Sequence, residues 1–280
     1  MKKLILISIF ISSLLSANQM VSVSILPQAY FVEKIAGDIL TTQVMVPPGS
    51  SPATYEPKPS QMESLEKSKV YFAIGVPFER VWLPKFQELI KGIKIVHTDE
   101  GIEKQKIHEH SHDGVTKSGL DPHIWLDPIL VKNQTLTMTN VLIEAFPEHK
   151  QTFLNNLKIF HDELDSLNEE VTLILSKTDR KKFMVFHPSW GYFSKRYDLT
   201  QISIEVEGKE PKPSMLASLI KKAKDEKIKT IFVSPAFSTK SAKTIAKEIK
   251  GEVVAIDPLA KDWKNELLKS ARAIALSLEK

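Results

Sequence analysis

The order of its apolar segments most constrains the fold of this chain of 280 residues. In both halves, short runs rich in β-branched residues alternate with runs whose apolar residues recur every three to four positions, so strands should alternate with helices. The expected strands are 21–26, 43–46, 70–75, 93–96, 182–186, 201–206, 229–234 and 252–256. The expected helices include 29–37, 79–92, one begun by a capping box at 60–63, 214–226, 238–249 and 262–278. This alternation predicts an α/β protein with parallel sheets covered by helices.

One long amphipathic segment lies between the two halves. After Pro147 the chain continues to Asp179 without glycine or another proline. Its apolar stripe consists of Phe153, Leu157, Phe160, Leu164, Leu167, Val171 and Leu175. We expect a helix over 147–178 that joins an N-terminal lobe, 18–146, to a C-terminal lobe, 179–280. An ordinary long surface helix is the alternative. His149 and His161 are expected to face solvent.

The amino terminus has the layout of a secretory signal peptide. Lys2 and Lys3 precede an apolar run that ends in small residues at Ser16 and Ala17. We expect residues 1–17 to be removed and the mature chain to be exported to the periplasm. The chain contains no cysteine, which excludes disulfides, thiolate metal sites and a cysteine-linked lipid anchor. Without Lys2 and Lys3 the net charge falls from +4 to +2, which favours neither nucleic acid nor a membrane surface as partner.

Several candidate binding residues follow the expected strands. Ligands of open parallel sheets bind beyond the carboxyl ends of the strands. His187 and Asp257 come directly after two expected strands, Ala53 lies in the loop after another, and His123 precedes a helix expected near Asp127. Two histidines and a carboxylate in one cleft can hold a divalent ion of zinc type. Alternatively, His187 is a core histidine, His123 caps a helix or hydrogen-bonds its own turn, and Asp127 and Asp257 are helix N-caps.

The motifs occur in a characteristic order, namely PPGSSPATYEPKPS, DPHIWLDP, FHPSWGYFSKRYDL, EGKEPKP and AIDPLA. In this order they closely resemble the zinc and manganese solute-binding receptors of bacterial ABC importers, the ZnuA/TroA-type family, over essentially the whole mature chain. The resemblance implies two lobes, each with a parallel four-stranded sheet, joined by one long rigid helix. It also implies a monomeric receptor that delivers its ion to an importer permease in the inner membrane.

The same resemblance implies His123, His187 and Asp257 as metal ligands. Manganese-type members often carry glutamate at the position of His187, so histidine favours Zn²⁺ over Mn²⁺. One departure is Ala53, where these receptors usually have a further histidine. The fourth coordination position is therefore open to water or another donor.

A second histidine cluster precedes DPHIWLDP. His108, His110 and His112 alternate in the polar run HEHSHDG. This run resembles the His-rich loop of zinc-type receptors and predicts a weak auxiliary site. A solvated loop with chance histidines is the alternative, and one of these histidines could instead supply the missing fourth ligand.

Two other functions fit the same features. Three protein ligands with one water also describe catalytic zinc, so an exported zinc-dependent hydrolase is one alternative. The chain lacks HExxH and GxSxG motifs, and we expect no enzymatic activity. A metal-binding adhesin on the same scaffold is the other alternative.

Overall fold

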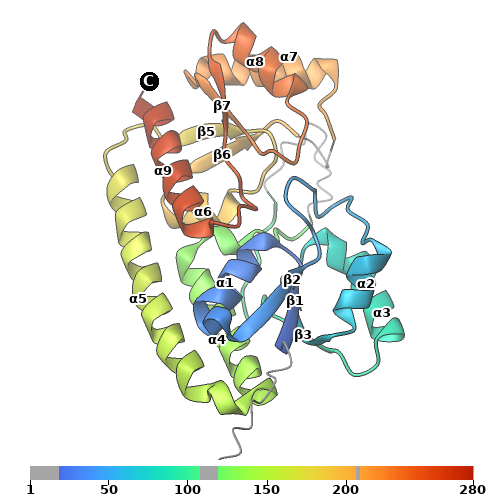
Figure 1. The fold of residues 1–280 in the computed structure, drawn as a ribbon. Coiled ribbons are helices and arrows are strands. Elements are labelled where there is room, and N and C mark those ends of the chain that lie inside the picture. The colour runs from blue at the N-terminus through green and yellow to red at the C-terminus, as the bar shows by residue number, and fades with distance from the viewer. Residues whose placement is uncertain (1–18, 108–118, 206–208, 280) are drawn as a thin grey trace, which may run out of the picture.

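The computed structural model describes residues 19–107, 119–205 and 209–279 (Figure 1). The expected signal peptide, 1–17, and the auxiliary histidines His108, His110 and His112 lie outside these ranges. Within them, no helix has the length and apolar character needed to cross a membrane.

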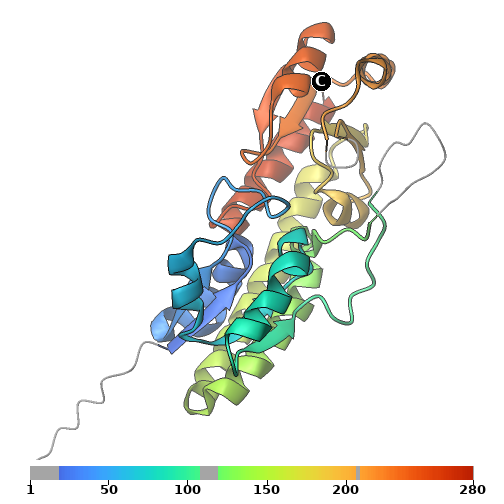
Figure 2. The same cartoon turned by 90° about the vertical axis from the view of Figure 1, so that its right-hand side faces the viewer.

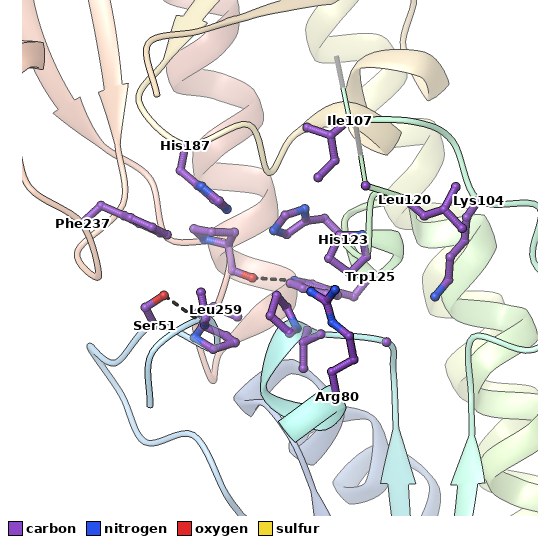
Figure 3. A pocket seen from close by; sticks show the side chains of 18 residues that line it. Ser51, Arg80, Lys104, Ile107, Leu120, His123, Trp125, His187, Phe237 and Leu259 are labelled. Atoms are coloured by element: carbon purple, nitrogen blue, oxygen red, sulfur yellow. Dashed lines mark hydrogen bonds between the residues drawn. The ribbon is translucent and has the colours of Figure 1, made fainter. Parts of the chain in front are cut away.

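The N-terminal lobe contains a parallel four-stranded sheet with strand order β2-β1-β3-β4. Its strands are β1 (Gln19–Val23), β2 (Leu40–Val44), β3 (Ser68–Ala73) and β4 (Lys94–His97). Its helices are α1 (Leu26–Ala36), α2 (Pro59–Leu65), α3 (Pro77–Leu89) and α4 (Pro128–Ala145). Because the strands are parallel, their carboxyl ends share one edge, and this edge faces the other lobe (Figures 1 and 3).

The C-terminal lobe repeats this arrangement with strand order β6-β5-β7-β8, again all parallel. Its strands are β5 (Lys182–Val185), β6 (Thr200–Ser203), β7 (Thr230–Val233) and β8 (Glu252–Ala255). Its helices are α6 (Gly191–Arg196), α7 (Pro213–Asp225), α8 (Lys240–Glu248) and α9 (Trp263–Glu279). The predicted fold class, two α/β lobes with parallel sheets, is confirmed.

The long helix α5 (Lys150–Leu175) runs along one side of both lobes (Figures 1 and 2). It packs on α1 and α4 of the first lobe and on α9 of the second. Every residue of its predicted apolar stripe is buried. Burial of one large apolar side chain contributes about 1.5–3 kcal/mol to the free energy of folding. The buried stripe therefore contributes strongly to holding the two lobes together.

The hydrophobic core also crosses between the lobes. One buried cluster joins the first sheet to α5, α9 and the inner face of the second sheet, whereas the outer face of the second sheet packs with α7 and α8 in a separate cluster. The Trp263 ring of α9 lies 5.2 Å from Phe31 and 5.9 Å from Tyr30, both on α1. The C-terminal helix therefore belongs to the same core as the first lobe.

Some local expectations were wrong. The strand expected over 21–26 ends at Val23 because the side-chain Oε1 of Gln28 accepts the N–H groups of Ser24 and Ile25 at 3.0 and 3.2 Å, which turns the chain into α1. Helix α2 begins at Pro59, not after a Ser60 cap. Its N-cap is Lys58, whose N–H donates to Gln61 Oε1 at 3.0 Å.

The prediction that both histidines near the long helix face solvent was also wrong. His149 is half-buried, and its ring lies 5.9 Å from Phe153. His161 is half-buried against α4, with its Nε2 atom 3.1 Å from Thr135 Oγ1, and burial lowers its pKa. The cause is the close packing of α5 along α4.

Candidate metal centre

A cavity of about 390 Å³ lies between the carboxyl edges of the two sheets (Figure 3). The first lobe supplies the loop around Ala53, the start of α3 and the segment around His123. The second lobe supplies His187, Phe237 and the Pro258–Leu259 turn. Two of the three predicted ligands, His123 and His187, line this cavity, and so does Ala53. Among the described lining residues none is Asp or Glu, so the third predicted ligand, Asp257, is not part of the lining.

His123 is held by the residue two positions before it. Asp121 Oδ1 lies 2.7 Å from His123 Nδ1 and accepts the His123 N–H at 2.9 Å. Asp121 is 1% exposed and His123 is 9% exposed. A carboxylate on Nδ1 favours the tautomer that keeps the proton there, which leaves Nε2 as a metal-binding lone pair. His123 precedes a 3-10 turn at Ile124–Leu126 and does not cap a helix by its side chain.

His187 comes two residues after β5 and is held in the same way. Its Nδ1 atom lies 2.9 Å from Glu205 Oε2, and Glu205 is 5% exposed. The Phe237 ring stacks on His187 at 4.3 Å between centroids. Burial lowers the His187 pKa, with nearby His123 acting in the same direction, while Glu205 opposes the shift. The imidazole is therefore neutral at neutral pH, which is the form that binds metal.

The two imidazoles face each other across the cavity. Their centroids are 5.3 Å apart and their planes meet at 74°. Zn–N distances of about 2.0–2.1 Å with a tetrahedral angle would separate the centroids of two zinc-bound imidazoles by about 5 Å. The spacing of His123 and His187 is thus already suited to one shared ion.

The structure does not bring the third predicted ligand into this pair. Asp257 is followed by the lining residues Pro258 and Leu259, and its Oδ1 atom accepts the Leu259 N–H at 2.9 Å. Burial raises its pKa, and the Leu259 N–H partly offsets this. Over residues 19–107, 119–205 and 209–279, no group of three or more His, Asp or Glu is placed to hold a metal ion. Coordination by Asp257 would use its other oxygen.

Asp127 and Asp257, the two aspartates with an alternative role as helix N-caps, differ in what they cap. Asp127 is the N-cap of α4 and accepts the Ile129 N–H at 2.8 Å, as the alternative interpretation predicted. It also pairs with Arg196 of the second lobe at 2.9 Å. Asp257 caps its own turn, because α9 begins only at Trp263.

Further polar contacts hold the His123 segment against the second lobe. Trp125 Nε1 donates to Pro258 O at 2.7 Å, and Trp263 Nε1 donates to Trp125 O at 2.9 Å. Gly191 permits close approach of α6, because a Cβ atom there would lie 2.5 Å from Asp121 Oδ2. These bonds set His123 and the Pro258 turn at a defined separation.

The first turn of α3 forms the remaining wall. Buried Glu79 accepts the N–H groups of Ile74 and Gly75 at 2.8 and 2.7 Å, and burial raises its pKa to about 7. Gly75 has φ +92°, and a Cβ atom would collide with the Lys104–Asp99 ion pair. This fixed turn places Arg80 on the cavity, with its side chain extending toward Trp125 and His123 (Figure 3).

Four residues of this site were not predicted from the sequence, namely Asp121, Glu205, Phe237 and Arg80. Asp121 had a usable signal, since an aspartate two positions before a candidate ligand is well placed to hold its ring. Glu205 follows the edge strand β6, so its contact depends on strand pairing that the sequence does not specify. Phe237 and Arg80 have no local signal.

Comparison with known proteins gives a consistent picture. A family model described as zinc-uptake complex component A, periplasmic, matches residues 21–279. A putative metal-binding protein of Chlamydia trachomatis is 27% identical, covering 93% of this chain and 92% of its own. The high-affinity zinc uptake system protein ZnuA of Bacillus subtilis is 26% identical, covering 83% of this chain and 76% of its own.

Solved structures agree with these relatives. A crystal structure of a ZnuA deletion mutant with zinc bound is 42% identical, with a TM-score of 0.86, and the match covers 93% of this chain and 98% of that one. A laminin-binding protein of Streptococcus agalactiae, described as an adhesin with metal-transporting activity, is 22% identical with a TM-score of 0.80. That match covers 93% of this chain and 99% of that one. The second similarity concerns the fold alone.

Proposed function

Because the chain belongs to the family of periplasmic zinc-uptake component A proteins, we propose that it binds Zn²⁺ in the periplasm and delivers it to the permease of an ABC importer. The observation that carries this proposal is the His123–His187 pair. Two buried carboxylates hold the Nδ1 atoms, and the rings are 5.3 Å apart. The cargo ion would bind the two Nε2 atoms.

Asp257 is the proposed third ligand. It adjoins the cavity through Pro258, and its hydrogen bond to Leu259 N–H occupies only one carboxylate oxygen. A set of two imidazoles and one carboxylate favours zinc over manganese, which prefers oxygen donors. The fourth position lies on the side of Ala53, whose methyl group cannot coordinate an ion.

A receptor fits the site better than a hydrolase. A zinc hydrolase needs a general base beside its metal-bound water, and among the described residues that line the cavity none carries a carboxylate. The carboxylates of Asp121 and Glu205 are engaged with the Nδ1 atoms of the two imidazoles. The described lining therefore favours binding of an ion over hydrolysis.

Zinc titration of the mature protein by calorimetry, with metal analysis, tests this proposal. We expect one tight ion per chain, and loss of that ion in a His123→Ala, His187→Ala double variant. His97→Ala is the matched control, since His97 is an exposed histidine at the end of β4. Tight zinc binding that survives in the double variant would refute the proposed site.

A further inference from the structure

The cavity holds a cation that a zinc site does not need. Arg80 lines the same space as His123 and His187. Among the residues that the structure describes, no hydrogen bond or ion pair of the Arg80 guanidinium is seen. The other cation on this wall, Lys104, is already paired with Asp99. Arg80 is exposed, so its guanidinium is hydrated and open to an anion that enters the cavity from solution.

The cavity is also larger than the ion requires. Its volume of about 390 Å³ lies within the usual range for small-molecule sites, about 300–1,000 Å³. One water occupies roughly 30 Å³ of the liquid, so a zinc ion with one bound water would leave most of the space unfilled. Apolar side chains form much of the wall, namely Val76, Pro77, Leu120, Phe237 and Leu259.

The metal site lacks one donor at the same place. Zinc prefers four ligands, and the chain offers two imidazoles and the Asp257 carboxylate, with only a methyl group at Ala53. A carboxylate supplied from solution has two oxygens. One can bind zinc in the fourth position while the other accepts hydrogen bonds from Arg80. The apolar part of the molecule that carries this carboxylate would contact the apolar wall of the cavity.

We propose that this cleft binds zinc together with a small organic monocarboxylate, which completes the coordination of the ion and pairs with Arg80. This inference rests on the proposed zinc site. A carboxylate held by both the ion and the guanidinium binds the zinc-loaded protein more tightly than the zinc-free protein, so each ligand strengthens binding of the other. Such coupling is reciprocal by thermodynamic linkage.

Butyrate is a suitable probe because it carries one carboxylate and a short apolar chain. Zinc titrations in sodium butyrate are compared with titrations in sodium chloride of equal ionic strength. A butyrate Kd of about 5 mM for the zinc-loaded protein would tighten zinc binding about fivefold at about 20 mM butyrate. This gain is the expected result for the wild-type protein.

Two variants locate the effect. Arg80→Gln removes the guanidinium, so the gain with butyrate should disappear while zinc affinity in chloride stays near the wild-type value. Lys85→Gln is the matched control on α3, because Lys85 contacts the Trp82 ring and does not line the cavity. It should keep the wild-type gain. Ala53→His should also lose the gain, since its imidazole fills the fourth position.

Cobalt substitution gives an independent readout. Co²⁺ has a visible d–d absorption spectrum that depends on its ligands, whereas Zn²⁺ has a filled d shell and shows none. Butyrate should change the visible spectrum of the Co²⁺-loaded wild-type protein and leave that of Ala53→His unchanged. If zinc affinity were equal in butyrate and chloride while binding still depended on His123, the proposed carboxylate ligand would be wrong and the proposed zinc site would remain supported. An unchanged gain in Arg80→Gln would overturn the role of Arg80. Zinc binding that does not depend on His123 would instead refute the proposed function.

Discussion

The two lobes share one strand order but present their cleft residues differently. In the C-terminal lobe, His187 and Asp257 each stand two residues after a strand, so the sheet itself places them. In the N-terminal lobe, Ala53 lies within a loop, and residues 98–122 separate His123 from β4. The sheet fixes the backbone of a position near a strand end, whereas the backbone of one on a long connection needs anchors.

Two of those anchors cross between the lobes, because Trp125 donates to Pro258 O and Asp127 pairs with Arg196. A third, Asp121, holds the His123 ring from within the same segment. The N-terminal histidine is therefore placed partly by the C-terminal lobe. If the two sides contribute equally once they are assembled, equivalent changes on either side should weaken zinc binding to a similar extent.

The largest expected effect is the loss of either histidine. His123→Ala and His187→Ala should each lower zinc affinity at least tenfold, about 1.4 kcal/mol, because each removes one of the few protein ligands. Calorimetric titration of both variants measures the effect. If only one substitution weakened binding, the two lobes would not share the ion.

Changes to the carboxylates behind the histidines should come next. Asp121→Asn and Glu205→Gln keep the side-chain shape but remove the charge that holds each Nδ1 proton, and such outer partners are typically worth about 10–100-fold in metal affinity. We expect about tenfold weaker zinc binding for each. Competition with a chromophoric chelator provides the measurement. Wild-type affinity in both variants would show that ring orientation comes from packing.

Filling the fourth coordination position on the N-terminal side should increase zinc affinity. Ala53→His would place an imidazole where the loop now has a methyl group, and we expect zinc affinity to rise about tenfold because zinc prefers four ligands. The same titration decides the result. Weaker binding would mean that another group already fills the fourth position. Unchanged binding would mean that residue 53 does not reach the ion.

Zinc affinity should also depend on pH in a defined direction. Burial lowers the pKa of His187, so this imidazole stays neutral down to values below the usual histidine pKa of about 6.5. Protons should therefore compete with zinc only below about pH 6.5, and affinity should fall as pH is lowered further. Titrations from neutral pH to about 5 measure the profile. A flat profile would indicate an all-oxygen site.

The smallest effect is expected from the auxiliary histidines. Deleting 108–113 keeps Ile107, which lines the cavity, and removes His108, His110 and His112. The tight ion should remain with unchanged affinity, while any weaker additional zinc is lost. Calorimetry of the deletion variant measures both. Loss of the tight ion would identify one of these histidines as the fourth ligand.

The sequence predicted the regular parts of this molecule well. Periodicity located both sheets and the buried stripe from Phe153 to Leu175, because these patterns reflect local geometry and burial. The strand-end rule predicted His187 at the carboxyl edge of the second sheet, and His187 lines the cavity there. The family motifs and the helix at Asp127 identified His123.

The supporting interactions could not be predicted, because they join residues far apart in the chain. Glu205 reaches His187 only because β6 pairs with β5, and Arg80 reaches the cavity only because the Glu79 carboxylate fixes the turn before it. The wrong expectation for His161 has the same origin, since its exposure depends on how α5 packs on α4. Local patterns do not encode these distances.

The central claim is that one zinc ion joins the two lobes at the histidine pair. Anomalous diffraction at the zinc edge, on crystals of the zinc-loaded protein, tests it most directly. We predict one strong peak within bonding distance of both His123 Nε2 and His187 Nε2, with an Asp257 oxygen beside it. A peak that contacts only one of the two histidines, or lies outside the cavity, would contradict this account.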